Sequence, residues 1–345
     1  MALMILLLHS SFMHELKNGV SLFEGWNQPI YRTLDAIFVG NITNIAVPLF
    51  FMVSGYLFFL KNDSFTLDDY KGKISKRIKS LLVPYLIWNV IIFFVYLTVQ
   101  TFVPSMASGR TKMIVDYTLS DYLSSFWSMS YVYDGGMNGP IDSPLWFVRD
   151  LMAMCVLSPI VYYMIKYLKA LLPVALVLLF ISNVWEGVPG LSISALAFFS
   201  LGAYLGMNKI KFAEISLKIL SYTVGLYVLL LIMILAAEVP AWLHLGRLEI
   251  VIGIVMSCSI AAWACTKGWK ISTFLTGSTF FVFASHCELL KVFIRLTSRL
   301  NVQNDLFYCV MYFVCPLLTL SILLIVYKVL RKYMPQVATM LSGGR

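Results

Sequence analysis

The chain has 345 residues, of which 60% are hydrophobic and 12% are charged, and its mean hydropathy is +0.83. Soluble domains are nearer half apolar and a quarter charged, so this composition excludes the soluble classes. The net charge of +9 would suit a nucleic-acid partner, but the Lys and Arg residues gather in short connections between apolar blocks. We therefore expect an all-α, polytopic membrane protein with no nucleic-acid partner.

Apolar blocks of about 18 or more residues predict spanning helices, because about 20 residues at 1.5 Å each cross the hydrocarbon core. The connections alternate between strongly and weakly basic, and the strongly basic ones are expected in the cytoplasm. An even number of segments then places both termini in the cytoplasm. We predict about ten transmembrane helices, at roughly 1–13, 42–60, 80–103, 144–165, 170–186, 192–207, 217–237, 248–266, 273–296 and 306–330.

We treat residues 1–335 as one membrane domain and 336–345 as a short cytoplasmic tail. The longest outside connection, about 104–143, is rich in Ser, Tyr, Asp and Gly. It fits a lid or a glycan-facing surface as well as an ordinary connector.

Several kinds of site are absent from the sequence. The six cysteines lie in or beside apolar blocks without C-x-x-C spacing, so we expect no metal site and no disulfide framework. The chain has no G-x-S-x-G elbow, P-loop, dinucleotide fingerprint or H-E-x-x-H motif. Its start lacks the basic region and the cleavage site of a signal peptide. A histidine base remains available to activate a hydroxyl directly.

Two histidines, His9 and His286, fall inside apolar segments. An imidazole in lipid is costly unless it is paired, and an ionisable intramembrane residue is a functional candidate. Histidine also titrates nearest physiological pH, so it can move protons. At 1.5 Å per residue, His9 lies roughly 9 Å and His286 roughly 15 Å below the outer boundary, which is compatible with a shared cavity. We predict His9 as a general base; the alternative is a histidine that hydrogen-bonds a neighbouring helix.

Two charged groups also lie within apolar segments. Arg149, with Asp150 beside it, would hold a carboxylate or stabilise charge on an acyl oxygen; the alternative is an internal Arg–Asp bridge between helices. Glu288, Lys291 and Arg295 share one helical face, which indicates a structural ion-pair ladder turned into the bundle. We assign Arg149 and His286 to orienting the acceptor or stabilising the oxyanion, and Trp146, Asp150 and Glu288 to substrate binding.

A dense basic cluster precedes the third segment: Lys73, Lys76, Arg77 and Lys79. Such clusters usually serve membrane orientation. This one would also suit the phosphates of a nucleotide-bearing donor.

Four stretches together resemble acyltransferase family 3, a family of bacterial integral-membrane acyltransferases. They are AVPLFFMVSGYLFF (46–59), KRIKSLLVPYLIWN (76–89), SPLWFVRDLMAMCVLSPIVYY (143–163) and FFVFASHCELL (280–290). The resemblance implies a ten-helix bundle that modifies the sugars of surface glycans.

The resemblance also implies roles for residues. The catalytic first-helix histidine matches His9, and the basic residues that engage acyl-coenzyme A match Arg77, with Lys76 and Lys79. The usual spacing of two arginines would place one at Ser80. The family's basic residue about eleven positions before the histidine has no counterpart, so either the true start lies upstream of Met1, which we favour, or the protein lacks that group.

We therefore predict transfer of an acyl group, most simply acetyl, from cytoplasmic acyl-CoA to a hydroxyl of a cell-surface or exopolysaccharide glycan. The protein would lie in the bacterial cytoplasmic membrane, with acyl-CoA as a co-substrate and no permanently bound cofactor. One alternative is a transporter or flippase that exports a glycan or its lipid-linked precursor. Another is a non-enzymatic membrane partner of a polymerase.

Overall fold

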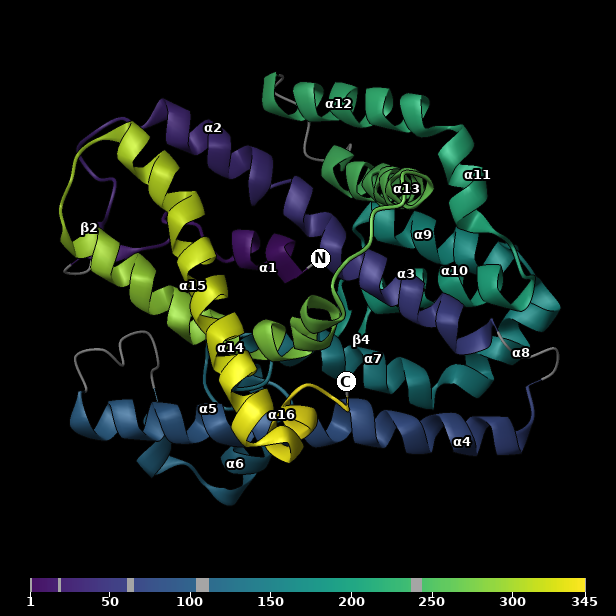
Figure 1. The fold of residues 1–345 in the computed structure, drawn as a ribbon, viewed down its shortest axis with the longest axis horizontal. Helices are drawn as coiled ribbons and strands as arrows, with labels where there is room; N and C mark the ends of the chain where they lie inside the picture. The colour runs from purple at the N-terminus through teal and green to yellow at the C-terminus, as the bar shows by residue number, and fades with distance from the viewer. Residues whose placement is uncertain (1, 18–19, 61–64, 104–111, 237–243, 345) are drawn as a thin grey trace.

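The computed structural model describes residues 2–17, 20–60, 65–103, 112–236 and 244–344, and these residues are mainly helical with almost no sheet. The helices shown in Figure 1 are α1 (Ala2–Leu8), α2 (Pro29–Phe38), α3 (Ala46–Phe59), α4 (Leu67–Arg77), α5 (Val83–Phe102), α6 (Leu119–Ser125), α7 (Trp146–Val156), α8 (Ser158–Leu168), α9 (Leu171–Ser182), α10 (Ile193–Met207), α11 (Phe212–Lys218), α12 (Leu220–Ala236), α13 (Leu245–Thr266), α14 (Thr273–Arg299), α15 (Asp305–Tyr333) and α16 (Pro335–Leu341).

Short elements connect these helices. Two antiparallel hairpins pair β1 (Leu16–Lys17) with β2 (Val20–Ser21) and β3 (Gly187–Val188) with β4 (Leu191–Ser192). Single 3₁₀ turns are η1 (Ile42–Ile45), η4 (Ile114–Asp116), η5 (Met129–Tyr131) and η6 (Ser143–Leu145), and a π-helical turn, η2 (Ile78–Leu82), joins α4 to α5.

Each of the ten predicted segments contains a helix, but the prediction of ten spans is not confirmed. On length and composition, four stretches of the described residues can cross a membrane, or up to six if each bent pair counts as one span. The four are Pro29–Phe59, Leu67–Phe102, Leu245–Thr266 and Asp305–Tyr333. This is the helix content of a multi-pass membrane protein, while the cytoplasmic location of both termini stays a prediction.

Fewer helices than predicted are long enough to cross a membrane, and the reasons are local. α1 has only seven residues. α7 and α8 are bent by 64°, and Pro159 in the first turn of α8 explains the break, because proline cannot donate to the preceding turn. α10 and α11 are bent by 101°, and α9 and α12 are apolar but shorter than a span.

Glycines bring α3 and α10 together backbone to backbone. A Cβ at Gly202 would lie 1.9 Å from the Met52 carbonyl oxygen, and one at Gly55 would lie 2.2 Å from that of Phe199. Gly202 and Gly206 have the small-xxx-small spacing that lets membrane helices approach closely. Helix α3, which carries one of the four family-like stretches, is therefore fixed by α10.

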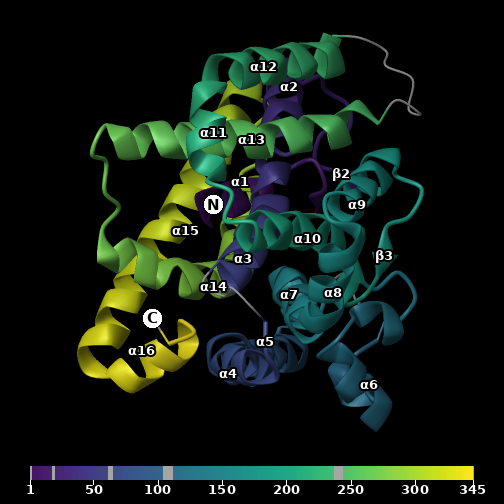
Figure 2. The ribbon, with the colours of Figure 1, turned by 90° about the vertical axis from the view of Figure 1, so that its right-hand side faces the viewer.

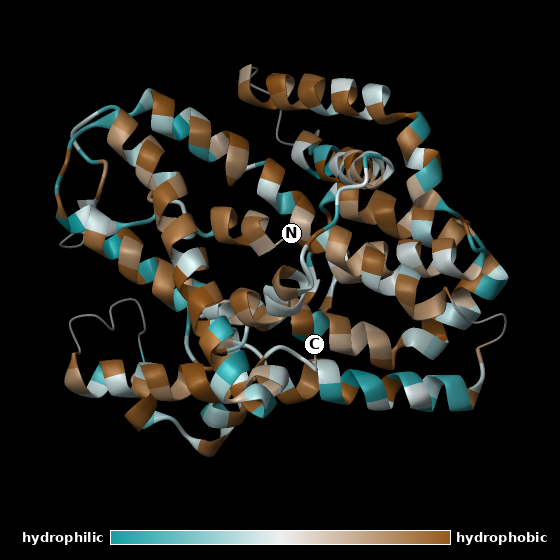
Figure 3. Ribbon diagram, in the orientation of Figure 1, coloured by the Kyte–Doolittle hydropathy of each residue, from teal (hydrophilic) through white to brown (hydrophobic). Residues whose placement is uncertain are grey.

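Two groups of helices lie on opposite sides of the molecule, and α1 and α3 lie between these groups. In both views α2 and α12 lie on one side and α4, α5 and α16 on the other (Figures 1 and 2). Helices α4, η2 and α5 follow one another as one stretch whose first part is hydrophilic and whose second part is apolar (Figure 3). Thr66 and Asp69 cap its start reciprocally. The basic residues at the end of α4 therefore lie just before the apolar part of this stretch begins.

Candidate active site

The first and ninth predicted segments bring two histidines together. Helix α1 ends at Leu8, and His9 lies in the turn that follows. Helix α14 packs against α1, and the ring centroid of His286 lies 5.3 Å from that of His9, with the ring planes tilted by 44°. The structure thus places side by side the two imidazoles that the sequence assigned to a shared cavity.

The hydrogen bond of His286 defines its tautomer. The side chain is fully buried, and Nδ1 lies 2.6 Å from the Phe283 carbonyl oxygen. A carbonyl oxygen only accepts, so Nδ1 carries the proton. Nε2 has no hydrogen-bond partner among the described residues. His286 therefore has a lone pair available inside the bundle.

Neighbouring helices hold the chain on both sides of His9. The His9 N–H donates to the Ile5 carbonyl at 3.2 Å. The Tyr312 hydroxyl of α15 donates to the Leu7 carbonyl at 2.9 Å, and the Phe12 N–H donates to the Tyr31 hydroxyl of α2 at 2.7 Å. The half-buried imidazole of His9 is thus carried on a backbone fixed by three helices.

A polar cluster lies on α14 next to the histidines. The Lys291 ammonium is 2.9 Å from Glu288 Oε1, and the Tyr96 hydroxyl of α5 donates to the same oxygen at 2.7 Å. The charge of Lys291 acts on both imidazoles. The Glu288–Lys291 part of the predicted ion-pair ladder is therefore present, whereas Arg295 interacts electrostatically with Glu15. Glu288 and Lys291 are 26% and 39% exposed, so the cluster reaches an accessible surface.

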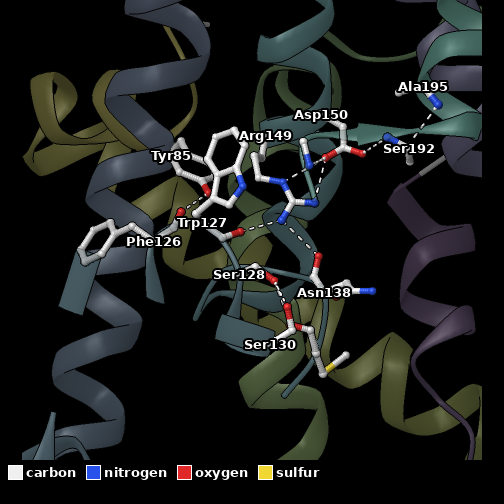
Figure 4. A network of polar contacts seen from close by, with 12 residues as sticks. Tyr85, Phe126, Trp127, Ser128, Ser130, Asn138, Arg149, Asp150, Ser192 and Ala195 are labelled. Carbon is white, nitrogen blue, oxygen red and sulfur yellow. Dashed lines mark hydrogen bonds and ion pairs between the residues drawn. The ribbon is translucent and has the colours of Figure 1, made fainter. Parts of the chain in front are cut away.

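Arg149 and Asp150 form a fully buried pair (Figure 4). The guanidinium lies 2.8 Å from Asp150 Oδ1 and also donates to the carbonyls of Trp127 and Asn138, at 2.6 and 3.1 Å. The Asp150 carboxylate accepts from the N–H groups of Gly190 and Ser192. An internal Arg–Asp pair is thus present, but within α7 and not as the predicted bridge between helices; its further bonds tie Trp127, Asn138 and the β3–β4 hairpin to α7.

A cavity of about 330 Å³, called the outer cavity after the orientation predicted from the sequence, opens beside this ion pair. Trp146, Arg149 and Asp150 line it, together with Asn138 and Ser192 from the connections that the pair holds. Ser143 also lines it, and its Oγ lies 4.0 Å from Cys287 Sγ, the neighbour of His286. Two of the predicted substrate-binding residues, Trp146 and Asp150, therefore share one cavity, while Glu288 lies in the histidine-side cluster.

The described part of the long outer connection forms a wall of this cavity. Met137, Asn138 and Gly139 line the cavity directly. Helix α6 begins with a capping box in which Thr118 and Asp121 bond reciprocally. Hydrogen bonds from Lys112 and Thr118 lower the pKa of Asp121 to about 2. Residues 112–143 thus make an ordered surface at the cavity, while residues 104–111 lie outside the described ranges.

The basic cluster divides into residues with different surroundings. Arg77 lines a small inner pocket of about 60 Å³ with Phe147 and Phe283. The ring of Phe283 packs edge-on to Phe147 at 4.8 Å, and its centroid lies 6.0 Å from that of His286. Phe283 therefore lines the pocket that Arg77 reaches and also neighbours the ring of His286.

The lysines around Arg77 differ from it. Lys76 and Lys79 are exposed and do not line the inner pocket. The Lys73 ammonium donates to the Phe58 carbonyl at the end of α3 and lies 4.8 Å over the Phe58 ring. Lys73 therefore anchors α4 to α3.

Sequence reasoning missed the tyrosines of the site. Tyr96 lies in α5 and Tyr312 in α15, both long apolar helices in which a tyrosine is expected to be an ordinary core residue. Only the three-dimensional packing shows that Tyr96 contacts Glu288 and that Tyr312 contacts the Leu7 carbonyl of α1.

A helical membrane bundle that brings two histidines together, with residues of a pocket and of a cavity close to His286 and Cys287, fits an enzyme that works within the membrane. Residues 1–340 match the family described as "Acyltransferase domain", and the chain belongs to this acyltransferase family, as the resemblance predicted. It is 24% identical over 326 residues to the succinoglycan biosynthesis protein ExoH of Rhizobium meliloti (strain 1021), covering 91% of this chain and 84% of that protein. No solved structure matches the chain.

Proposed function

We propose that the protein transfers an acyl group, acetyl in the simplest case, from cytoplasmic acyl-CoA to a hydroxyl of an exopolysaccharide or cell-surface glycan. Its site would lie in the bacterial cytoplasmic membrane. Membership of the acyltransferase family supports the group transfer, and a relative named for succinoglycan biosynthesis supports a polysaccharide acceptor. The observation that carries the proposal is the His9–His286 pair, because Phe283 of the Arg77 pocket neighbours His286 and Ser143 of the outer cavity neighbours Cys287.

In this proposal His9 is the general base. It removes the proton from a sugar hydroxyl while the hydroxyl oxygen attacks the thioester carbonyl. The carbon–sulfur bond then breaks, and the proton passes from His9 to the departing coenzyme A thiolate. His286 keeps its Nδ1 proton on the Phe283 carbonyl, so its unpartnered Nε2 is available to accept a hydrogen bond from the neighbouring His9 ring and to orient it during the reaction.

The charged neighbours take separate roles. Lys291, whose charge acts on both imidazoles, stabilises the oxyanion that develops on the thioester oxygen. For Arg149 we propose that it shapes the acceptor cavity, and its bonds to Asp150 and to two carbonyls support this role over the predicted oxyanion contact.

The donor is expected at the basic end of α4. Guanidinium and ammonium groups bind phosphates, and Arg77 is the member of the cluster that faces the inner pocket. The exposed side chains of Lys76 and Lys79 are placed to meet the nucleotide part of acyl-CoA.

A flippase is the second candidate, because discontinuous helices are typical of transporters and this chain has two bent pairs.

An experiment with sealed vesicles that contain the purified protein and an enclosed glycan acceptor distinguishes an acyltransferase from a flippase. Radiolabelled acetyl-CoA is supplied only to the face that exposes α4, and the enclosed glycan is then analysed. The proposal predicts an ester-linked label on the enclosed glycan. Movement of glycan without any label, with acetyl-CoA or other acyl-CoA donors, would contradict it.

A further inference from the structure

The C-terminal segment, residues 335–344, is docked on α5. Ala338 is 2% and Leu341 8% exposed, and Ser342 is fully buried. The Trp88 indole of α5 donates to the Leu341 carbonyl at 3.0 Å, and its ring packs edge-on to Phe281 of α14 at 5.4 Å. The segment therefore contacts the helix that follows the basic cluster and, through Trp88, the helix that carries His286.

The segment ends against the π-helical turn η2. Gly343 has φ +73°, and a Cβ there would lie 2.6 Å from the Ser80 carbonyl oxygen and 3.8 Å from Pro84 Cγ. Pro84 lacks the N–H that an α-helix would supply to the Ser80 carbonyl, and this carbonyl oxygen lies against Gly343. Only a residue without a side chain fits so close to that oxygen with this backbone conformation.

We propose that residues 335–343 of this segment are a positioning element of the donor site. By closing on η2 they fix the turn that lies directly between the basic end of α4 and the apolar helix α5, and thereby the places of Arg77 and Lys79. This inference rests on the proposed function, since it takes those residues to bind the phosphates of acyl-CoA. The C-terminal segment itself touches neither substrate.

Two neighbouring glycines make a matched test in the full-length protein. Gly344 has φ +80° and no atom within 4 Å of a Cβ, so Gly343→Ala and Gly344→Ala carry the same backbone strain, but only the first meets Ser80. With the purified protein, Gly343→Ala should raise the KM for acetyl-CoA by about fivefold or more and change kcat by less than about twofold. Gly344→Ala should leave both within about twofold of wild type.

Hydrogen exchange of residues 78–90, followed by mass spectrometry, shows whether the docking itself is lost. Faster exchange in Gly343→Ala alone, together with the raised KM, supports the inference. Equal KM values in the two variants would overturn it while leaving the proposed function intact. If the wild-type protein turns over no acyl-CoA, the proposed function fails, and the donor-site role of the segment fails with it.

Discussion

Arg149 and His286 are both buried in the bundle, but only His286 has a ring nitrogen without a hydrogen-bond partner among the described residues. Arg149 donates to Asp150 and to two backbone carbonyls, whereas Nε2 of His286 has no partner among the described residues. A buried polar atom without a partner costs free energy, so its retention needs a reason. A role in orienting His9 supplies that reason for His286.

The Arg149–Asp150 pair gives a prediction about stability. Asp150→Asn leaves a buried guanidinium without its counter-charge, so the free energy of unfolding should fall by about 3–5 kcal/mol. Thermal unfolding of the purified protein measures this. Glu214→Gln is the control, because its pair with Lys211 is 67% and 73% exposed and such pairs contribute less than about 1 kcal/mol. Similar losses in the two variants would show that the buried pair is not a structural anchor.

Candidate residues could be identified from the sequence, but the contacts that these residues make could not. A histidine in an apolar run is visible in a single sequence, and so both imidazoles were found. The choice for Arg149 between an oxyanion contact and an internal pair was not visible, because it depends on the carbonyls of Trp127 and Asn138 in a distant connection.

At the scale of elements, the packing of α3 on α10 depends on glycine. Gly202→Ala would place a methyl group against the Met52 carbonyl, and overpacking of this kind costs about 1–3 kcal/mol. We expect a lower unfolding temperature and reduced acyl transfer, both measured on purified protein. Gly225→Ala in α12 meets no atom within 4 Å and should be neutral or slightly stabilising. Equal effects of the two substitutions would contradict the close packing.

The α4–η2–α5 stretch carries a prediction about the donor. Arg77→Ala removes the guanidinium that lines the inner pocket, and loss of a charged hydrogen bond of about 1.5–3 kcal/mol raises the KM for acetyl-CoA by about tenfold or more. Lys71→Ala removes an exposed charge from the same helix and should change KM by less than about twofold. Initial rates at varied donor concentration decide between them. An unchanged KM in Arg77→Ala would remove Arg77 from the donor site.

For the whole molecule, hydrophobic blocks predicted where helices occur but not which helices are continuous. Segment 144–165 was expected as one helix, and the structure breaks it between α7 and α8. Pro159 was visible, but a proline is compatible with the first turn of a helix as well as with a bend. The helices α2, α6 and α16 were not expected, because their sequences are short or mixed in character and tertiary packing decides their conformation.

The central claim is that His9 is the base of an acyltransferase, and a single kinetic comparison tests it most directly. Acyl transfer is measured for His9→Ala and for His14→Ala, the latter an exposed histidine in the same stretch, with protein abundance in the membrane as the control. Because a general base contributes about 10² to 10⁴ in rate, kcat should fall at least about a hundredfold in His9→Ala and stay near wild type in His14→Ala. A His9→Ala protein of normal abundance that transfers acyl groups at the wild-type rate would contradict the account.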